Sequence, residues 1–340
     1  MSGKASEQGD AMISLDHAVR IALSASEDLG PKGMRAMFEK WGGPSALVHA
    51  AQRGDPGIPL ALRPFLAGAE ERGRTIAQQC EQLGIDILVR GSPDWPESLE
   101  CLDDVPEILF VRGKLSVVQR SAVGIVGSRE CSAAGEELAA RMAARLAEEG
   151  WATVSGMARG IDAAAHRGSL DGGGETIAVL GCGIDVRYPE ENLDLHQRIP
   201  QNGLLVSEFA PGMPPISGNF PRRNRILSAL SQAIVLVECR VRSGALITCR
   251  HALDQGREVF IVPGWPTSPL SAGPLQFLRE GARAIRNAED LLEDLRGFGT
   301  PSIPAGEAVA EPALDERAAR DARARLELLG PASRFPAAAQ

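Results

Sequence analysis

The strongest chemical signal in the sequence is a cluster of arginines between residues 217 and 257. This stretch holds seven arginines and only two acidic residues, Glu238 and Asp254, in a chain whose formal net charge is −8. Guanidinium groups that follow a phosphate backbone, with an aromatic ring on which a base can stack, are what a single-stranded nucleic acid requires. A solvated face is the ordinary alternative for a charge run. Because a phenylalanine opens the run and a glycine-containing loop follows it, the cluster predicts a site for an anionic polymer. Its members are Phe220, Arg222, Arg223, Asn224, Arg225, Arg240 and Arg242.

Three loops with glycine, serine and arginine suit phosphate groups. Glycine lets a ligand approach the backbone, and the N-terminus of a following helix favours an anion. The arginine of each loop adds a planar fork of donors. The first loop is Gly127, Ser128 and Arg129, the second is Ser155, Gly156, Arg159 and Gly160, and the third is Arg242, Ser243 and Gly244.

No arrangement in the sequence predicts catalysis. A Gly-x-Gly-x-x-Gly dinucleotide fingerprint is absent, so we expect no cofactor. Asp162 and His166 lie four residues apart and could be metal ligands or an acid–base pair. A hydrogen bond that fixes their helix against the sheet is favoured, since no third ligand is near in sequence. Ser243 lacks a nucleophile elbow, and Cys182 and Cys249 lack a motif partner. We therefore predict no catalytic residue and no metal.

The elements that must position these loops alternate along the chain. Short β-rich apolar runs are joined by helical stretches, which indicates a parallel sheet buried on both faces. The runs are 123–126, 152–154, 176–180, 204–206, 234–237 and 259–262. The sequence thus predicts an α/β, Rossmann-like doubly wound domain, in which ligands bind at the carboxyl ends of the strands.

The remaining segments divide the chain into three expected parts. Residues 15–77 have helical periodicity, and 29–33 loosely resembles a helix-hairpin-helix, although a plain turn explains the same glycines. Two short strands near 85–89 and 108–111 lead into the sheet. We expect a helical domain over 1–110 with this lead-in, the Rossmann-like domain over 111–296, and a Pro/Ala-rich linker with one charged helix over 297–340.

Length and composition restrict the class of protein further. The chain has 340 residues, of which 44% are hydrophobic and 24% charged, as in globular proteins of about two domains. No apolar stretch approaches the roughly 20 residues of a membrane span, and the N-terminus lacks a signal-peptide core. The six cysteines match no disulfide framework. We expect a soluble, cytoplasmic protein with reduced thiols, whose acidity leaves nucleic-acid binding to a local basic site.

An ordered set of motifs resembles the DNA-processing protein A family, also called DprA or Smf. Each motif alone is weak, but the series in this order is specific, and the helical N-terminus resembles the family's sterile-alpha-motif-like domain. The motifs are Gly124-Ile125-Val126-Gly127-Ser128-Arg129, residues 155–162 with Ala165-His166, residues 178–183 with Tyr188-Pro189, Ser207-Glu208, residues 220–225, residues 243–248, and residues 256–259 with Pro263-Gly264.

The resemblance implies a non-enzymatic protein that binds and protects single-stranded DNA taken up in natural transformation and helps to load the RecA recombinase. It also implies a homodimer formed through the Rossmann-like domain. Arg242 stands where we expect a lysine in many members, Pro274 departs from the usual loop, and 322–329 resembles only the first helix of the family's winged-helix domain. The implied DNA-binding residues are Gly127, Ser128, Arg129, Ser155, Gly156, Arg159, Gly160, Phe220, Arg222, Arg223, Asn224, Arg225, Arg242, Ser243, Gly244 and Thr248.

Two rival functions stay open at this point. The related lysine-decarboxylase-like phosphoribohydrolases hydrolyse nucleotides with a glycine-rich loop and a nearby glutamate, whereas here no acid follows Ser243-Gly244 until Asp254. The second rival is a protein that binds another protein and whose arginines are only a solvated face. Because neighbouring residues of a helix point in different directions, Arg222, Arg223 and Arg225 cannot all face one groove, and one could pair with Glu238 instead.

Overall fold

The computed structural model describes residues 13–26 and 29–296. The linker and charged helix expected over 297–340 lie outside the described residues. None of the helices in the described part of the chain combines the length and the hydropathy that a membrane span needs.

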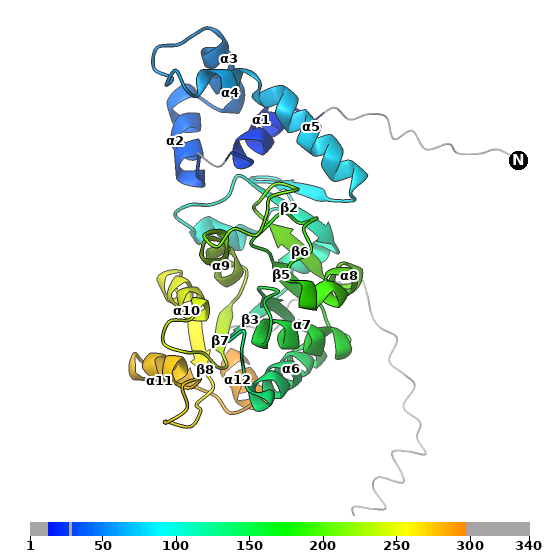
Figure 1. The fold of residues 1–340 in the computed structure, drawn as a ribbon, viewed down its shortest axis with the longest axis vertical. Coiled ribbons are helices and arrows are strands. Elements are labelled where there is room, and N and C mark those ends of the chain that lie inside the picture. Colours follow the sequence, from blue (N-terminus) through cyan, green and yellow to red (C-terminus); the bar gives the residue numbers. More distant parts are fainter. Residues whose placement is uncertain (1–12, 27–28, 297–340) are drawn as a thin grey trace, which may run out of the picture. The chain divides into compact units, whose positions relative to one another are not determined.

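Residues 13–26 and 29–82 contribute five helices, as their apolar periodicity predicts (Figure 1). Val19, Leu23, Met34, Leu47 and Leu66 form the centre of their common core. Proline starts α2 and α3, where its missing N–H would have no partner in the helix. The helices are α1 (Leu15–Ser24), α2 (Pro31–Trp41), α3 (Pro44–Gln52), α4 (Arg63–Ala67) and α5 (Ala69–Gln82).

The rest of the described chain forms one nine-stranded sheet with the order β1-β2-β6-β5-β4-β3-β7-β8-β9. Strands β3 to β9 are mutually parallel, whereas β1 pairs antiparallel with β2, and β2 pairs antiparallel with β6. The two lead-in strands therefore extend the same sheet. The strands are β1 (Asp86–Val89), β2 (Ile108–Gly113), β3 (Ala122–Val126), β4 (Ala152–Ser155), β5 (Thr176–Val179), β6 (Leu204–Ser207), β7 (Ala233–Leu236), β8 (Glu258–Ile261) and β9 (Arg283–Ala284).

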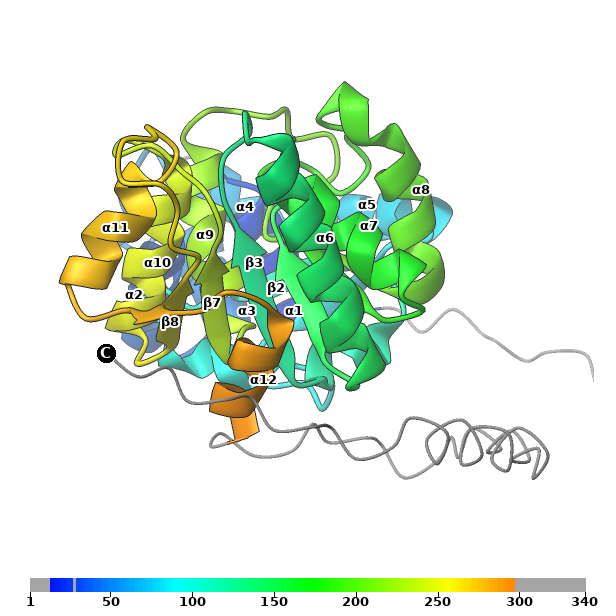
Figure 2. The same cartoon turned by 90° about the horizontal axis from the view of Figure 1, so that it is seen from below.

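The strand order confirms the doubly wound fold. From β3 the chain winds one way through β4, β5 and β6, and then returns to the other side of β3 with β7 and β8. The reversal between β3 and β7 is the topological switch point of such a sheet, where the loops after the two strands separate and leave a crevice. Figure 2 shows the loops that follow β3, β7 and β8 along one edge of the sheet.

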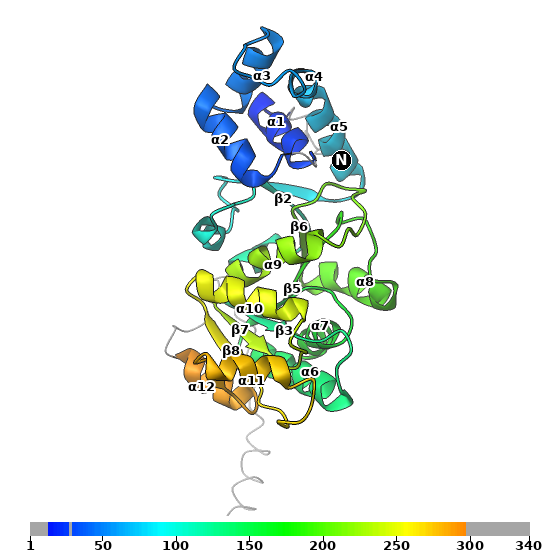
Figure 3. The same ribbon diagram turned by 60° about the vertical axis from the view of Figure 1, so that its left-hand side comes forward.

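Helices cover both faces of the sheet (Figure 3). Within β3, Val123 and Ile125 pack on one face with α6, α7 and α12, while Ala122 and Val126 pack on the other with α9, α10 and α11. Burial of every β3 side chain explains why the strand reads as a continuous apolar run. The helices are α6 (Ala133–Glu148), α7 (Ile161–Asp171), α8 (Leu193–Asn202), α9 (Asn219–Ala229), α10 (Gly244–Asp254), α11 (Ala272–Arg279) and α12 (Ala288–Leu295), and the 3₁₀ turns are η1 (Glu97–Cys101), η2 (Leu115–Gln119) and η3 (Glu190–Asn192).

Candidate nucleic-acid interface

Two adjoining hollows lie at the carboxyl ends of the parallel strands. The larger, which we call the groove, has a volume of about 750 Å³ and runs across the switch point. The smaller, the side pocket, has a volume of about 670 Å³ and extends toward the loops after β4 and β5. The two share Arg129, Phe220 and Arg223 in their walls. The groove is also lined by the candidate residues Gly127, Ser128, Arg159, Asn224, Arg242, Ser243, Gly244 and Thr248.

The loop after β3 is fixed by its neighbours and projects Arg129. Ser128 N donates to Glu238 O at 2.6 Å, and Ile161 N donates to Ser128 O at 3.2 Å. A Cβ on Gly127 would lie 2.6 Å from Ile161 Cγ1, so the β3 loop and α7 approach too closely for any larger residue. The side chain of Arg129 is exposed beyond this anchored backbone.

The N-terminus of α6 already holds an internal carboxylate, contrary to the expectation that it attracts an external anion. Ser132 caps the helix by accepting from Gly135 N at 3.0 Å. Glu238, which follows β7, accepts from Ser132 N at 2.8 Å and from Ser132 Oγ at 2.7 Å. Glu238 therefore satisfies the helix end and does not pair with an arginine of the 222–225 run.

Side chains of α7 and η3 hold the loop after β4. Gly156 N donates to Asp162 Oδ2 at 3.1 Å, and Asn192 Nδ2 donates to Met157 O at 2.9 Å. Met157 has a φ of 59°, which a non-glycine residue adopts only where its surroundings impose it. Asp162 is buried, and burial raises the pKa of its carboxyl although Arg223 opposes the shift.

His166 ties α7 to the sheet through both of its ring nitrogens. The hydroxyl of Thr176 donates to Thr153 O at 2.8 Å, so the 2.7 Å contact between His166 Nδ1 and Thr176 Oγ1 requires the ring nitrogen to donate. His166 Nε2 then accepts from Met157 N at 3.4 Å. Burial, reinforced by the charge of Arg223, lowers the pKa of His166 to about 3. Asp162 and His166 thus have the structural role that their spacing favoured, and no cluster of three metal-ligating side chains occurs within residues 13–26 and 29–296.

Two of the four candidates in the second loop, Ser155 and Gly160, line neither hollow, and a third, Arg159, is paired with an acid. Ser155 is fully buried, and its hydroxyl donates to Ile125 O at 2.6 Å. Gly160 has a φ of 71°, and a Cβ there would lie 2.4 Å from Ser128 O. Arg159 lies at the rim, where its Nη1 is 3.2 Å from Glu191 Oε1. The loop therefore offers mainly Gly156 and Arg159 to the two hollows.

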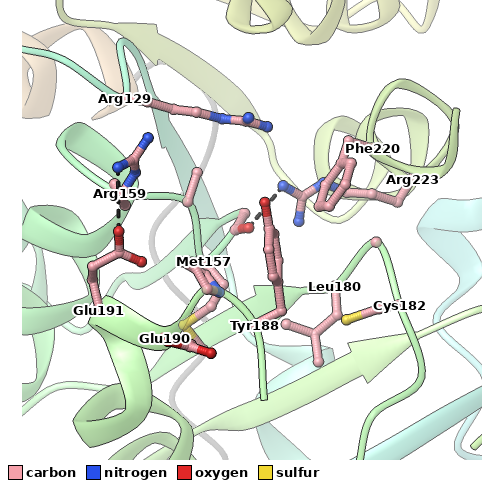
Figure 4. Close-up of a pocket in the computed structure, with 14 residues that line it drawn as sticks. Arg129, Met157, Arg159, Leu180, Cys182, Tyr188, Glu190, Glu191, Phe220 and Arg223 are labelled. Carbon is pink, nitrogen blue, oxygen red and sulfur yellow. Dashed lines mark hydrogen bonds and ion pairs between the residues drawn. The ribbon is translucent and has the colours of Figure 1, made fainter. Parts of the chain in front are cut away.

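Arg223 is the buried cation between the groove and the side pocket (Figure 4). Only 4% of its surface is exposed. Its Nη2 donates to Gly156 O at 2.7 Å and its Nε donates to Asn224 Oδ1 at 3.0 Å, while Nη1 is buried without a hydrogen-bond partner among the described residues. Burial lowers the pKa of Arg223 to about 10, which still leaves the side chain charged at neutral pH. An unpaired buried donor is costly, so Nη1 is the donor of Arg223 for which a ligand could supply the missing acceptor.

The other two arginines of the run point away from the groove. Arg225 is buried between Glu208 and Asp104, with Nη2 3.0 Å from Glu208 Oε2 and Nε 2.7 Å from Asp104 Oδ2. Arg222 Nη2 also lies 3.0 Å from Glu208 Oε2. Residues 222 and 225 are three apart on α9 and share a face, whereas Arg223 is turned about 100° from Arg222. Of the three arginines, only Arg223 lines the groove, and the acid that pairs with its neighbours is Glu208.

Exposed cations and an aromatic ring form the rim of the groove. Arg129, Arg240 and Arg242 are exposed, and none makes an ion pair within the part of the chain that the structure describes. The guanidinium carbon of Arg129 lies 5.5 Å from the centroid of the Phe220 ring. The Phe220 ring is in turn 5.6 Å from that of Tyr188. Arg240 and Tyr188 line the groove but were not among the predicted site residues, although Arg240 belongs to the arginine cluster.

The start of α10 completes the groove on its β7 side. Ser243 caps the helix by accepting from Ala245 N at 3.3 Å, and Asn224 Nδ2 donates to Gly244 O at 3.2 Å. Asn224 thus joins α9 to α10 across the groove. Thr248 is 2% exposed and forms part of the floor. Gly244 faces open space, since a Cβ there would meet nothing within 4 Å.

The side pocket combines an apolar floor with aromatic and cationic walls, and Glu190 and Glu191 add acidic groups at its edge. Met157, Leu180 and Cys182 line it together with Tyr188 and Phe220 (Figure 4). Burial raises the pKa of the Cys182 thiol to about 11, so the thiol is protonated at neutral pH and a poor nucleophile. The two hollows together suit an anion carrying a flat aromatic ring, which is the chemistry of a nucleotide.

The family model, the curated relatives and the solved structures all include members of one family. The family model described as DNA recombination-mediator protein A matches residues 86–296. The DNA processing protein DprA of Bacillus subtilis is 39% identical over 223 residues, which are 65% of this chain and 75% of that protein. The structure of DNA processing protein A from Streptococcus pneumoniae matches with a TM-score of 0.66 and 31% identity, covering 83% of this chain and 98% of that one. The structure from Helicobacter pylori, solved to describe its single-stranded DNA binding mode, matches with a TM-score of 0.58 and 28% identity, covering 63% and 96%.

Proposed function

This chain belongs to the DNA recombination-mediator protein A family, and we propose that it binds single-stranded DNA in the groove and helps to load RecA onto that DNA during recombination. The DNA includes strands taken up in natural transformation. One observation carries the proposal: Arg129, Arg240 and Arg242 are exposed, make no ion pair with any residue that the structure describes, and line a groove whose wall also holds the buried Arg223, with Nη1 unpaired among the same residues. Such a concentration of unneutralised positive charge, in a chain of net charge −8, favours a polyanion.

The groove favours a single strand over a duplex for a physical reason. Phe220 lines both hollows, and a base can stack on its ring only when the base has left the stack of neighbouring base pairs that a duplex imposes. We assign the phosphates to Arg129, Arg223 Nη1 and Arg242, and one unstacked base to Phe220 and the side pocket. Gly244 leaves room for the backbone to approach α10.

The experiment is fluorescence anisotropy of a labelled oligo-dT with the full chain, with duplex as competitor, between about 50 and about 200 mM salt. We expect binding that favours the single strand and weakens as salt rises, because bound arginines release counterions. Absence of binding at low salt, or equal affinity for duplex, would reject the proposal.

The role toward RecA is tested separately. RecA hydrolyses ATP when it assembles on single-stranded DNA, so a loading protein shortens the lag before hydrolysis on a limiting amount of DNA. The full chain should shorten this lag, and a variant that no longer binds oligo-dT should not. An unchanged lag in the presence of the full chain would reject the role in RecA loading, and would not affect the proposal that the chain binds single-stranded DNA.

The proposal has further parts. We propose a cytoplasmic homodimer without enzymatic activity, in which the Rossmann-like domain binds DNA. The domain was expected over 111–296, and its sheet also takes in β1 and β2 of the lead-in. Light scattering of the full chain should give twice the mass of 36.0 kDa. Incubation with nucleoside monophosphates should release no free base, and release would instead favour a phosphoribohydrolase.

A further inference from the structure

An exposed tryptophan lies on the loop after β8, outside both hollows. Trp265 exposes 76% of its surface, whereas Trp95 and Trp151 expose 5% and 4%. A large aromatic side chain this exposed leaves a ring face free for a ligand, and tryptophans with one apolar face available are typical of binding surfaces.

The Trp265 loop is attached to the segment that carries the rim arginines. At its start, Val262 N donates to Leu236 O at 3.0 Å, and at its end Cys239 N donates to Leu270 O at 2.8 Å. Both ends of the loop are therefore hydrogen-bonded to residues 236–239, directly before Arg240. The loops after β7 and β8 lie at the same edge of the sheet (Figure 2).

The loop is preformed and carries no charge that would repel a phosphate. Residues 262–271 include Pro263, Pro266 and Pro269 and no acidic residue. Ser268 N donates to Trp265 O at 2.9 Å, which closes a turn on the tryptophan. The prolines on both sides of Trp265 and this turn restrict the backbone of the loop. Stacking of a base on Trp265 therefore costs little conformational entropy of the loop.

We propose that Trp265 is a second stacking platform for single-stranded DNA, reached by a strand that leaves the groove over Arg242 and Arg240. The inference rests on the proposed function and extends it. The occupant is a nucleic acid strand because Arg240 and Arg242, which line the groove and directly follow the residues to which this loop is hydrogen-bonded, are exposed and have no acidic partner among the described residues. A protein partner of ordinary apolar character would leave these charges unpaired.

The test compares Trp265→Ala with Leu253→Ala on a ladder of oligo-dT from about 4 to about 20 nucleotides. Leu253 is a matched control, since it is 49% exposed but lies at the end of α10, at the opposite edge of the sheet. Short oligonucleotides that fill only the groove should bind both variants like the unmodified chain. Above a threshold length, the unmodified chain and Leu253→Ala should gain about tenfold in affinity, and Trp265→Ala should not. Trp265→Phe should recover most of the gain.

The outcomes separate the inference from the proposed function. Normal binding of short strands with no length-dependent loss in Trp265→Ala would overturn the platform alone. A change of oligomeric mass in Trp265→Ala without loss of affinity would also overturn it, and would assign the loop to contact with a second copy. An unmodified chain that binds no oligonucleotide of any length would overturn both.

Discussion

Arg225 and Glu208 form a buried two-point ion pair, in which Nη1–Oε1 and Nη2–Oε2 are both 3.0 Å. Their side chains are 5% and 1% exposed, and Asp104 accepts from Nε of the same arginine. The two carboxylates outweigh the effect of burial and raise the pKa of Arg225. The pair joins α9 to the end of β6 and to the segment after η1, and it explains why one conspicuous arginine of the run is structural.

Loss of this arginine should destabilise the fold. Arg225→Ala leaves the Glu208 carboxylate buried beside Arg222 alone, and we expect a loss of about 3–5 kcal/mol in the free energy of unfolding, measured in urea. Arg225→Met combined with Glu208→Leu removes both charges and should recover most of that loss. A cost below about 1 kcal/mol for the single variant would show that the pair contributes little.

Loss of the rim cations should affect binding and not stability. Arg129→Ala combined with Arg242→Ala should weaken oligo-dT binding and reduce the slope of log affinity against log salt by about 0.7 for each phosphate contact removed. Stability should change by no more than about 0.5 kcal/mol, because both side chains are exposed and neither forms an ion pair with a described residue. Arg141→Ala, on the exposed face of α6 with Glu137 as its partner, is the matched control and should bind normally. An equal slope in all three proteins would contradict these contacts.

A methyl group at position 156 should displace the buried Arg223. A Cβ on Gly156 would lie 2.2 Å from Arg223 Nη2, so Gly156→Ala should cost about 1–3 kcal/mol of stability and weaken DNA binding. Gly244→Ala is the comparison, since its Cβ meets open space and an alanine suits a helix better than glycine. Thermal unfolding compares the melting temperatures of the two variants. Equal melting temperatures would contradict the close approach of Arg223 to Gly156.

His166 should make the fold sensitive to acid. Its pKa is about 3 in the folded chain and about 6.5 when unfolded, so between these values the unfolded state binds a proton that the folded state does not. Stability should therefore fall on acidification from about pH 6.5 toward pH 3, by up to about 1.4 kcal/mol per pH unit from this residue. His196, whose pKa burial also lowers, adds to the same trend.

The contribution of His166 can be separated by substitution. His166→Asn removes the titration and should flatten this acid slope, although the loss of two hydrogen bonds lowers stability at neutral pH. Urea unfolding at a series of pH values gives both slopes. Parallel curves for the two proteins would show that another group causes the acid sensitivity.

Much of the fold could be predicted because its determinants are local. The parallel strands β3 to β8 are buried on both faces and therefore appear as short apolar runs, so their positions and the doubly wound class were predicted correctly. Strand ends then placed the loops that contain Arg129, Gly156 and Arg242 at one edge. The location of the candidate site follows from the same pattern.

The role of each arginine was decided only by the tertiary structure. Sequence fixes the residue types and their order, but whether a guanidinium is free or neutralised depends on acids from distant segments, such as Glu208 and Asp104 for Arg225. The same holds for Glu238, which the fold brings to the N-terminus of α6, and for Asp162 and His166, which it turns inward. Sequence alone thus determined which strand ends carry the site. The long-range packing determined which charges remain for a ligand, because burial and ion pairing are set by contacts between residues far apart in the chain.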